Sequence, residues 1–229
     1  MQPYLFPYIG YFQLMNAVDE FVLYDNIKFT KRGWIHRNRI LVNGKDAYIS
    51  LPLKKDSDFL DVRERSLAET WPSEKKKILN RITGSYKKAP NFQQVYPLIE
   101  VSMMYDGVKL FDFIHHSIML VKNYLEIPCS IIVASSLPID HDLKSEKKVI
   151  AICKQRRAST YINPIGGVDL YSDQNFKEEG IDLQFIKMSP FRYKQFDNDF
   201  IPFLSIIDVM MFNSREEIKQ FLSTGYTLV

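Results

Sequence analysis

Apolar and polar positions in the first part of the chain predict a short helix followed by a buried strand. After Gly10, apolar side chains recur at three- and four-residue spacing, which is typical of one face of a helix; they are Tyr11, Leu14, Met15 and Val18. Residues 21–24 form an apolar run that ends at Asp25. Ligands of open α/β sheets bind beyond the carboxyl ends of the strands. The end of this strand is therefore a candidate site.

A hairpin is expected next. Residues 40–42 and 48–51 read as two short strands, and the pair Asn43-Gly44 lies between them. Asn and Gly tolerate the positive φ angles of a tight two-residue turn, so this pair is a strong hairpin signal.

The middle of the chain is dominated by helical periodicity. Three amphipathic helices are expected, at 73–88, 92–105 and 107–125. A continuous apolar run then covers residues 129–134. Such a run indicates a strand buried on both faces, as in a parallel sheet.

The second half alternates helix and strand. A helix is expected at 145–157, short strands at 160–163 and 181–185, helix or turn at 168–178, and a helical region at 201–222. This order predicts an α/β fold with an open, mostly parallel sheet, Rossmann-like or, more narrowly, nucleotidyltransferase-like. Residues 1–229 are expected to form a single domain, within which 71–127 is a candidate helical subdomain.

Composition narrows the function classes. The formal net charge is only +3, too weak to indicate nucleic acid as the ligand. The two cysteines, Cys129 and Cys153, stand in apolar patterns, and neither they nor the four histidines have metal-ligand spacing. No metal and no cofactor is therefore expected. Neither a signal peptide nor a membrane span is expected, so a cytoplasmic location is predicted.

The first candidate site is the aromatic amino-terminal loop. Pro3 and Pro7 restrict its backbone, and the helix that opens at Gly10 has free backbone N–H groups that suit an anion. Such a loop makes a stiff pocket wall, although a packed aromatic terminus would have the same composition. The binding residues expected here are Gln2, Tyr4, Tyr8 and Gly10.

The second candidate site is the basic stretch that follows Asp25. A carboxylate at a strand end next to several cations suits a phosphorylated ligand, with the acid as general base or orienting group. A solvated basic loop with Asp25 as a salt-bridge partner is the alternative. The residues singled out are Asp25, Asn38 and Arg39 as catalytic groups, and Lys28, Lys31, Trp34 and Arg37 as binding groups.

Two further features lie later in the chain. Ser135, Ser136 and Asn163 follow predicted strands, and small donors at such ends suit phosphate or carboxylate, although ordinary turn chemistry explains them nearly as well. Asp208 falls within an apolar helical segment, where a carboxylate requires a partner. We expect that partner to be one of the amino-terminal arginines.

The motifs together resemble the WbqC-like protein family. The resemblance rests on MQPYLFPYIGYFQLM, AVDEFVLYD and KRGWIHRNRI, and on the later blocks SSLPID, ICKQRRASTYINP and FIPFLSIIDVMMFN. Two departures stand out. Family members usually have a few apolar residues before the first Gln-Pro, and His36 stands where Asn is usual. The second departure argues against His36 as the catalytic base.

The resemblance implies a role in bacterial O-antigen and surface-polysaccharide biosynthesis. The expected function is a transferase, with N-acyl or aminoacyl transfer onto a nucleotide-linked amino sugar. The expected partners are therefore a sugar nucleotide and an acyl or aminoacyl donor. Family membership does not fix the reaction type.

Two alternatives stay open. One is an ATP-using ligase or nucleotidyltransferase of the same fold class, although Tyr8-Ile9-Gly10-Tyr11 stands in place of that family's His-x-Gly-His signature and lacks its charge stabilisers. The other is a non-catalytic binding subunit of a glycan assembly complex.

Overall fold

The computed structural model describes residues 1–229. The helices are α1 (Ile9–Asn16), α2 (Trp71–Tyr86), α3 (Phe92–Met103), α4 (Leu110–Tyr124), α5 (Ser145–Arg156), α6 (Asp173–Glu178), α7 (Ile206–Phe212) and α8 (Arg215–Thr224), with 3-10 turns η1 (Val62–Glu64), η2 (Ala134–Ser136) and η3 (Ile165–Leu170). The strands are β1 (Glu20–Leu23), β2 (Arg37–Val42), β3 (Lys45–Ser50), β4 (Ser130–Val133), β5 (Thr160–Pro164), β6 (Asp182–Met188) and β7 (Tyr226–Leu228). The predicted α/β class is confirmed.

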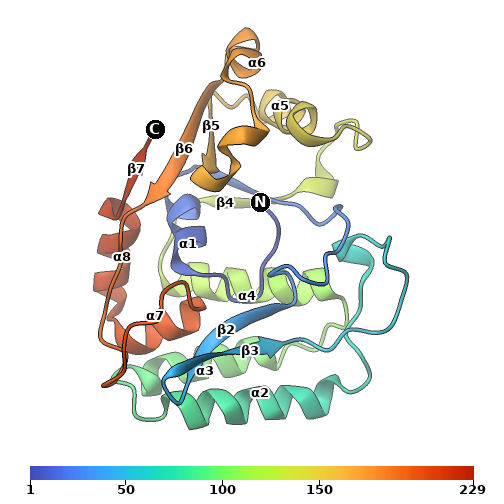
Figure 1. Ribbon diagram of the computed structural model, residues 1–229. Helices are drawn as coiled ribbons and strands as arrows, with labels where there is room; N and C mark the ends of the chain where they lie inside the picture. The colour runs from blue at the N-terminus through green and yellow to red at the C-terminus, as the bar shows by residue number, and fades with distance from the viewer.

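The strands form three small sheets rather than the continuous open sheet that we expected. β1 pairs in parallel with β4, β2 and β3 form an antiparallel hairpin, and β6 lies between parallel β5 and antiparallel β7. Figure 1 shows α2, α3 and α4 along the bottom and the β5–β6–β7 sheet with α5 and α6 at the top.

The sheet is interrupted between β1 and β5. Each of these strands bonds to a neighbour on one side only, and residues of both strands line a slot of about 570 Å³. Met1 also lines the slot. Its amino group donates to the Val22 carbonyl oxygen at 2.7 Å, and the Tyr24 N–H donates to the Met1 carbonyl oxygen at 2.9 Å. The parallel strands of the fold therefore belong to two separate sheets.

The structure corrects the expectation that the apolar run of β4 is buried on both faces. Ser130 is exposed, and the three apolar residues that follow it are only half-buried. The reason is that β4 has a single hydrogen-bonded neighbour, β1, and so forms an edge.

Local sequence signals account for most of the helix and turn boundaries. Asn43 and Gly44 both have positive φ angles, of 50° and 74°, as the predicted hairpin turn requires. The helical region expected at 201–222 is broken into α7 and α8 at Asn213, whose backbone is extended. Ser214 then caps α8 through reciprocal bonds with Glu217, a capping box that starts a new helix.

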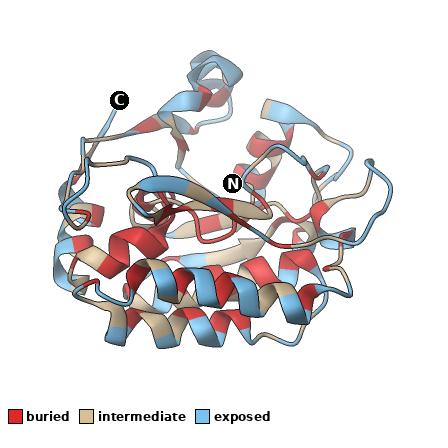
Figure 2. Ribbon diagram, turned by 60° about the horizontal axis from the view of Figure 1, so that its bottom comes forward, coloured by how far each residue is buried: buried red, intermediate tan, exposed pale blue.

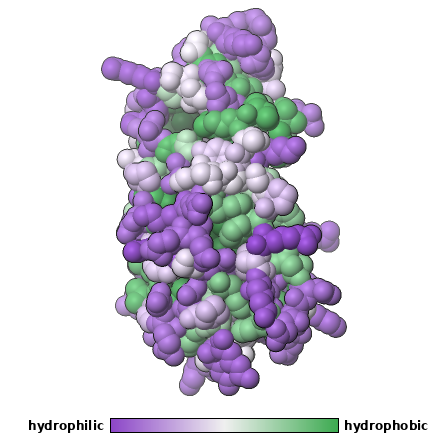
Figure 3. Space-filling view, turned by 90° about the vertical axis from the view of Figure 1, so that its left-hand side faces the viewer, coloured by the Kyte–Doolittle hydropathy of each residue, from purple (hydrophilic) through white to green (hydrophobic).

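One cluster of 44 buried apolar residues joins the amino-terminal segment, the hairpin, α2–α4 and α7–α8. Figure 2 shows the consequence in the helices at the bottom of Figure 1, whose exposed residues face outward and whose buried residues face inward. Figure 3 shows the side of β7 and α8, where apolar patches lie between hydrophilic ones. The exposed Leu228 and Val229 at the end of the chain belong to this side.

Candidate functional site

The amino-terminal loop is held by three hydrogen bonds from two buried polar side chains. The Asn38 side-chain amide donates to the carbonyl oxygens of Leu5 at 2.9 Å and Phe6 at 2.8 Å. The Ser205 hydroxyl donates to the same Phe6 oxygen at 2.7 Å. Phe6 has a φ angle of 40°, a conformation that non-glycine residues adopt only when their surroundings hold them there. The loop is therefore held rigidly.

This loop forms one wall of a small cavity of about 200 Å³, which we call the aromatic cavity. Its lining residues are Tyr4, Pro7, Tyr8, Trp34, Asn38, Arg39 and Phe203. Five residues that the sequence singled out from two separate stretches thus lie together. The Leu5 N–H, which donates to the Trp34 and Ile35 carbonyl oxygens, and the Asn38 amide bring the two stretches into contact.

Arg39 is the charged group of the aromatic cavity. Its Nη1 donates to Asp46 Oδ2 at 3.1 Å, and its guanidinium carbon lies 5.6 Å from the centre of the Trp34 ring. Its Nε is buried and has no hydrogen-bond partner. A buried donor without a partner is costly, so Arg39 holds an unsatisfied N–H group in the wall of the cavity.

A larger cavity of about 620 Å³ adjoins the aromatic cavity and shares Tyr8 and Phe203 with it. We call it the strand-end cavity, because it lies where β5 and β6 end, next to the start of α1. Lys187 and Arg192 give it positive charge. No sequence pattern marks Lys187, Arg192 or Phe203, since their positions in the cavity follow from the path of the chain through the end of β6 and beyond it.

Burial keeps the cavity hydroxyls protonated. Burial raises the pKa of Tyr8 above its ordinary value. The pKa of Tyr4 is also raised, mainly by burial and to a smaller extent by the nearby Tyr8. Both side chains are therefore hydrogen-bond donors at neutral pH. The Tyr4 hydroxyl donates to Gln2 Oε1 at 3.2 Å, so Gln2 orients Tyr4. Gln2 itself lines neither cavity.

Gly10 is where the loop meets α1 and Tyr8. A Cβ atom at this position would lie 2.4 Å from the Tyr8 ring. The absence of a side chain therefore lets the ring pack against the helix start, between the two cavities.

Asp25 lies outside both cavities. It is 3% exposed, and its Oδ1 accepts the Ser135 N–H at 2.9 Å, so it joins the carboxyl ends of β1 and β4. Ser136 donates its hydroxyl to the Val133 carbonyl oxygen at 2.7 Å. This geometry suits an orienting role.

The remaining basic candidates are dispersed over the surface. Lys28 lies over the Phe59 ring at 4.6 Å, and Lys31 forms an exposed ion pair with Asp58 at 2.6 Å. Arg37 donates to the main-chain oxygens of Gly33 and Arg32. None of the three lines the aromatic or the strand-end cavity.

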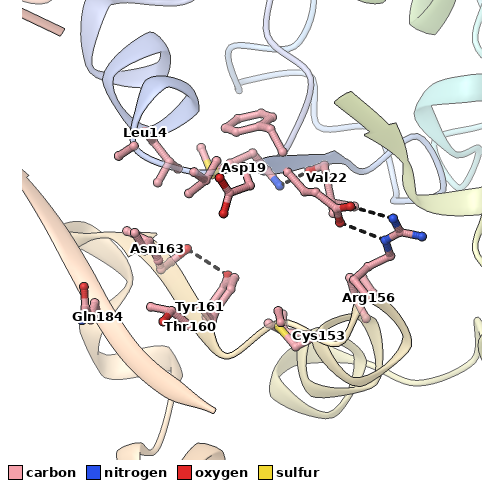
Figure 4. A pocket seen from close by; sticks show the side chains of 18 of the residues that line it. Leu14, Asp19, Val22, Cys153, Arg156, Thr160, Tyr161, Asn163 and Gln184 are labelled. Atoms are coloured by element: carbon pink, nitrogen blue, oxygen red, sulfur yellow. Dashed lines mark hydrogen bonds and ion pairs between the residues drawn. The ribbon is translucent and has the colours of Figure 1, made fainter. Parts of the chain in front are cut away.

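Asn163 belongs to the slot between β1 and β5, shown in Figure 4. It accepts a hydrogen bond of 3.2 Å from the Tyr161 hydroxyl. At the other end of the slot, Glu20 and Arg156 form an ion pair with two hydrogen bonds, of 2.8 and 2.6 Å. Asn163 is thus separated from the other candidate residues.

Asp208 has partners other than the arginine that we expected. The hydroxyls of Tyr86 and Tyr193 donate to it at 2.8 and 2.6 Å, and the Gln195 amide donates at 2.7 Å. Burial raises the pKa of Asp208, and the three hydrogen bonds act in the opposite direction. The amino-terminal arginines are bonded elsewhere: Arg37 donates to main-chain oxygens that precede β2, and Arg39 donates to Asp46 of β3.

No group of three or more His, Cys, Asp or Glu side chains is placed to hold a metal ion. No helix has the length and apolar character that crossing a membrane requires.

Comparison with known proteins gives one family and one distant relative. The sequence model of the WbqC-like protein family matches residues 2–220, nearly the whole chain. The chain is also similar to the uncharacterized protein Rv1507c of Mycobacterium tuberculosis, with 27% identity over 222 residues that cover 94% of this chain and 93% of that protein. No solved structure matches.

Proposed function

This chain belongs to the WbqC-like protein family, and from that premise we propose that it is a transferase of bacterial O-antigen or other surface-polysaccharide biosynthesis. Its substrate is a nucleotide-linked amino sugar, and the reaction is the transfer of an acyl or aminoacyl group onto the sugar amine. The observation that carries this proposal is the adjacency of the aromatic and strand-end cavities.

The aromatic cavity suits the nucleotide part. Tyr8, Trp34 and Phe203 present ring faces and edges at its wall, and aromatic rings stack on bases with little sequence preference. The Arg39 side chain next to them has a buried N–H without a partner. An arginine in this position binds a phosphate oxygen in good geometry.

The strand-end cavity suits the sugar and the acyl donor. Its volume of about 620 Å³ lies within the range of pockets that enclose whole small molecules. Lys187 and Arg192 add charge for a diphosphate or a phosphorylated donor. Because Tyr8 and Phe203 belong to both cavities, a ligand that spans them passes these two rings.

In acyl transfer the sugar amine attacks the carbonyl carbon of an activated acyl donor, and negative charge develops on the carbonyl oxygen. When the carbonyl double bond re-forms, the bond from the acyl carbon to the donor's leaving group breaks, and the proton lost by the amine passes to the leaving group or to water. The protonated Tyr8 hydroxyl between the cavities is the donor that we assign to the carbonyl oxygen. Asn38 acts as a positioning residue, since its amide is fully used in holding Leu5 and Phe6. Asp25 has an orienting role at the strand ends.

Calorimetry with a panel of nucleotide-linked sugars tests the proposal. We expect one of them to bind, and Trp34→Ala and Arg39→Met each to weaken that binding by about tenfold or more, equivalent to at least ~1.4 kcal/mol. Phe59→Ala removes an aromatic ring that is 81% exposed and lines neither cavity, so it should leave the affinity unchanged. Equal binding by all three variants would contradict the assignment.

A further inference from the structure

A third pocket is lined by several positively charged side chains. It has a volume of about 220 Å³, and its charged or titratable lining residues are Lys31, His36, Lys54, Lys55, Asp56 and Arg65. No lining residue is shared with the aromatic or the strand-end cavity. We call it the Arg65 pocket.

Arg65 is a buried cation without a counter-ion. The residue is 4% exposed, its main chain is bonded on both sides to Val62 and Leu110, and it forms no salt bridge with any acid of the chain. Its Nη1 donates to the Ser57 carbonyl oxygen at 2.9 Å, and its guanidinium carbon lies 4.8 Å from the centre of the Phe29 ring. Its Nε is buried and has no partner. An uncompensated buried charge is strongly unfavourable, so this site favours the arrival of an anion.

The nearby acids do not supply the missing charge. Asp58 is mostly exposed and pairs with Lys31 at 2.6 Å. The charge of Arg65 lowers the pKa of Asp58 less than Lys31 does, and Arg65 and Asp58 form no salt bridge. Asp56, which lines the pocket, accepts the Ser57 N–H at 2.8 Å in a local turn. Lys54 and Lys55 line the pocket without an ion pair, and with Arg65 they leave it a surplus of positive charge.

His36 adds a second polar atom that has no partner. Its ring packs against Phe29 at 5.2 Å, and its Nδ1 is buried without a hydrogen bond. Burial, together with the charges of Arg37 and Arg65, lowers the pKa of His36 to about 4. The ring is therefore neutral at pH 7, and an anion placed beside it would raise its pKa.

We propose that the Arg65 pocket is a binding site for a phosphoryl group. A planar guanidinium with two lysines matches the several oxygens and the double charge of phosphate better than a single carboxylate does. The pocket volume is several times the roughly 30 Å³ that a water molecule occupies, which leaves room for the group and its remaining hydration. The source is inorganic phosphate or the phosphate of a small phosphomonoester. This site stands independently of the transferase proposal.

Thermal unfolding and NMR of the His36 ring at low ionic strength test the site, with inorganic phosphate, glucose 1-phosphate and chloride as added anions. We expect either phosphate compound, but not chloride at equal ionic strength, to raise the melting temperature and the pKa of His36. A preference of tenfold or more for glucose 1-phosphate identifies an ester ligand, and the reverse preference identifies inorganic phosphate. Equal affinity shows that the pocket binds the phosphoryl group alone. No response of His36 to either compound would overturn the proposal.

Two variants separate binding from folding. Arg65→Met removes the buried charge and keeps an unbranched side chain, so we expect a folded protein whose melting temperature no longer responds to phosphate. The double variant Lys54→Ala/Lys55→Ala changes only exposed positions and should weaken phosphate binding by about tenfold. The matched control Lys87→Ala/Lys88→Ala removes two exposed lysines that line none of these pockets. A phosphate response retained in both test variants, or lost equally in the control, would refute the assignment.

Discussion

Tyr193 donates a hydrogen bond of 2.6 Å to Asp208, and so links a wall of the strand-end cavity to the hydrophobic core. Tyr193 lines the cavity, whereas Asp208 is inaccessible to solvent. The same carboxylate accepts bonds from Tyr86 and Gln195. The cavity wall is thereby attached to α7 and, through Tyr86, to α2, which is far from it in the sequence.

Removing this carboxylate should cost more stability than removing one of its donors. Asp208→Ala removes the acceptor of the buried Tyr86 hydroxyl and of the half-buried Tyr193 hydroxyl, whereas the Gln195 amide keeps its bond to the Ile201 carbonyl oxygen. Each unsatisfied group costs about 1–3 kcal/mol, so we expect a loss of about 2 kcal/mol or more in the free energy of unfolding. Tyr193→Phe removes one bond, and we expect about 1 kcal/mol. Urea unfolding of both variants measures the difference, and an equal loss for the two would show that the network does not act as described.

Gly10→Ala should affect ligand binding and leave the fold intact. The new Cβ would lie 2.4 Å from the Tyr8 ring, and the ring can move toward the cavities to relieve the clash. We expect affinity for the nucleotide-linked sugar to fall by about tenfold, or ~1.4 kcal/mol. Gly84→Ala is the control, because nothing lies within 4 Å of its Cβ position in α2; it should stabilise the helix by up to ~1 kcal/mol without changing affinity.

The His36 ring should titrate near pH 4 in the folded protein and near its ordinary value of 6.5 in the unfolded chain. Between these values the unfolded state binds more protons, so this residue makes stability increase as pH rises from about 4 to 6.5. Comparing the pH dependence of unfolding for the wild type and His36→Gln isolates the contribution. A variant with the same slope over this range would show that burial of His36 has no such effect.

Magnesium-dependent binding of ATP distinguishes the transferase from an ATP-using ligase or nucleotidyltransferase. The transferase proposal predicts that calorimetry with ATP gives the same result with and without magnesium. Tight binding that requires magnesium would favour the ligase or nucleotidyltransferase instead. The nucleotide-linked sugar that binds in the panel serves as the positive control for a competent protein sample.

The sequence predicts those helices and turns that depend only on residues close together along the chain. The hairpin rests on Asn43-Gly44, and α1 rests on the apolar spacing after Gly10, so both could be placed without knowledge of the fold. The sequence singles out Tyr4 and Tyr8 in one candidate site and Trp34 and Arg39 in another. Their contact depends on the main-chain and Asn38 bonds between the two stretches.

Features that depend on long-range placement could not be predicted in this way. Phe203 joins the aromatic cavity from near the end of the chain, and no periodicity marks it. The partners of Asp208 are two tyrosines and a glutamine instead of an arginine, because burial requires donors but does not specify which ones. The pairing of two predicted strands likewise depends on how distant parts of the chain pack, which the pattern of neighbouring residues does not specify.

The slot between β1 and β5 has a consequence for how the molecule opens. No main-chain hydrogen bond crosses it, and the pair formed by Glu20 and Arg156 at its end is partly exposed, so it contributes little. The β5–β6–β7 sheet with α5 and α6 should therefore behave as a separate unit of local unfolding. In amide hydrogen exchange we expect Ile162 and Phe185 to lose protection together and earlier than Leu41 of β2, whose N–H is bonded to the buried Tyr86 hydroxyl. Equal protection at the three amides would mean that the β5–β6–β7 sheet unfolds only together with the rest of the chain.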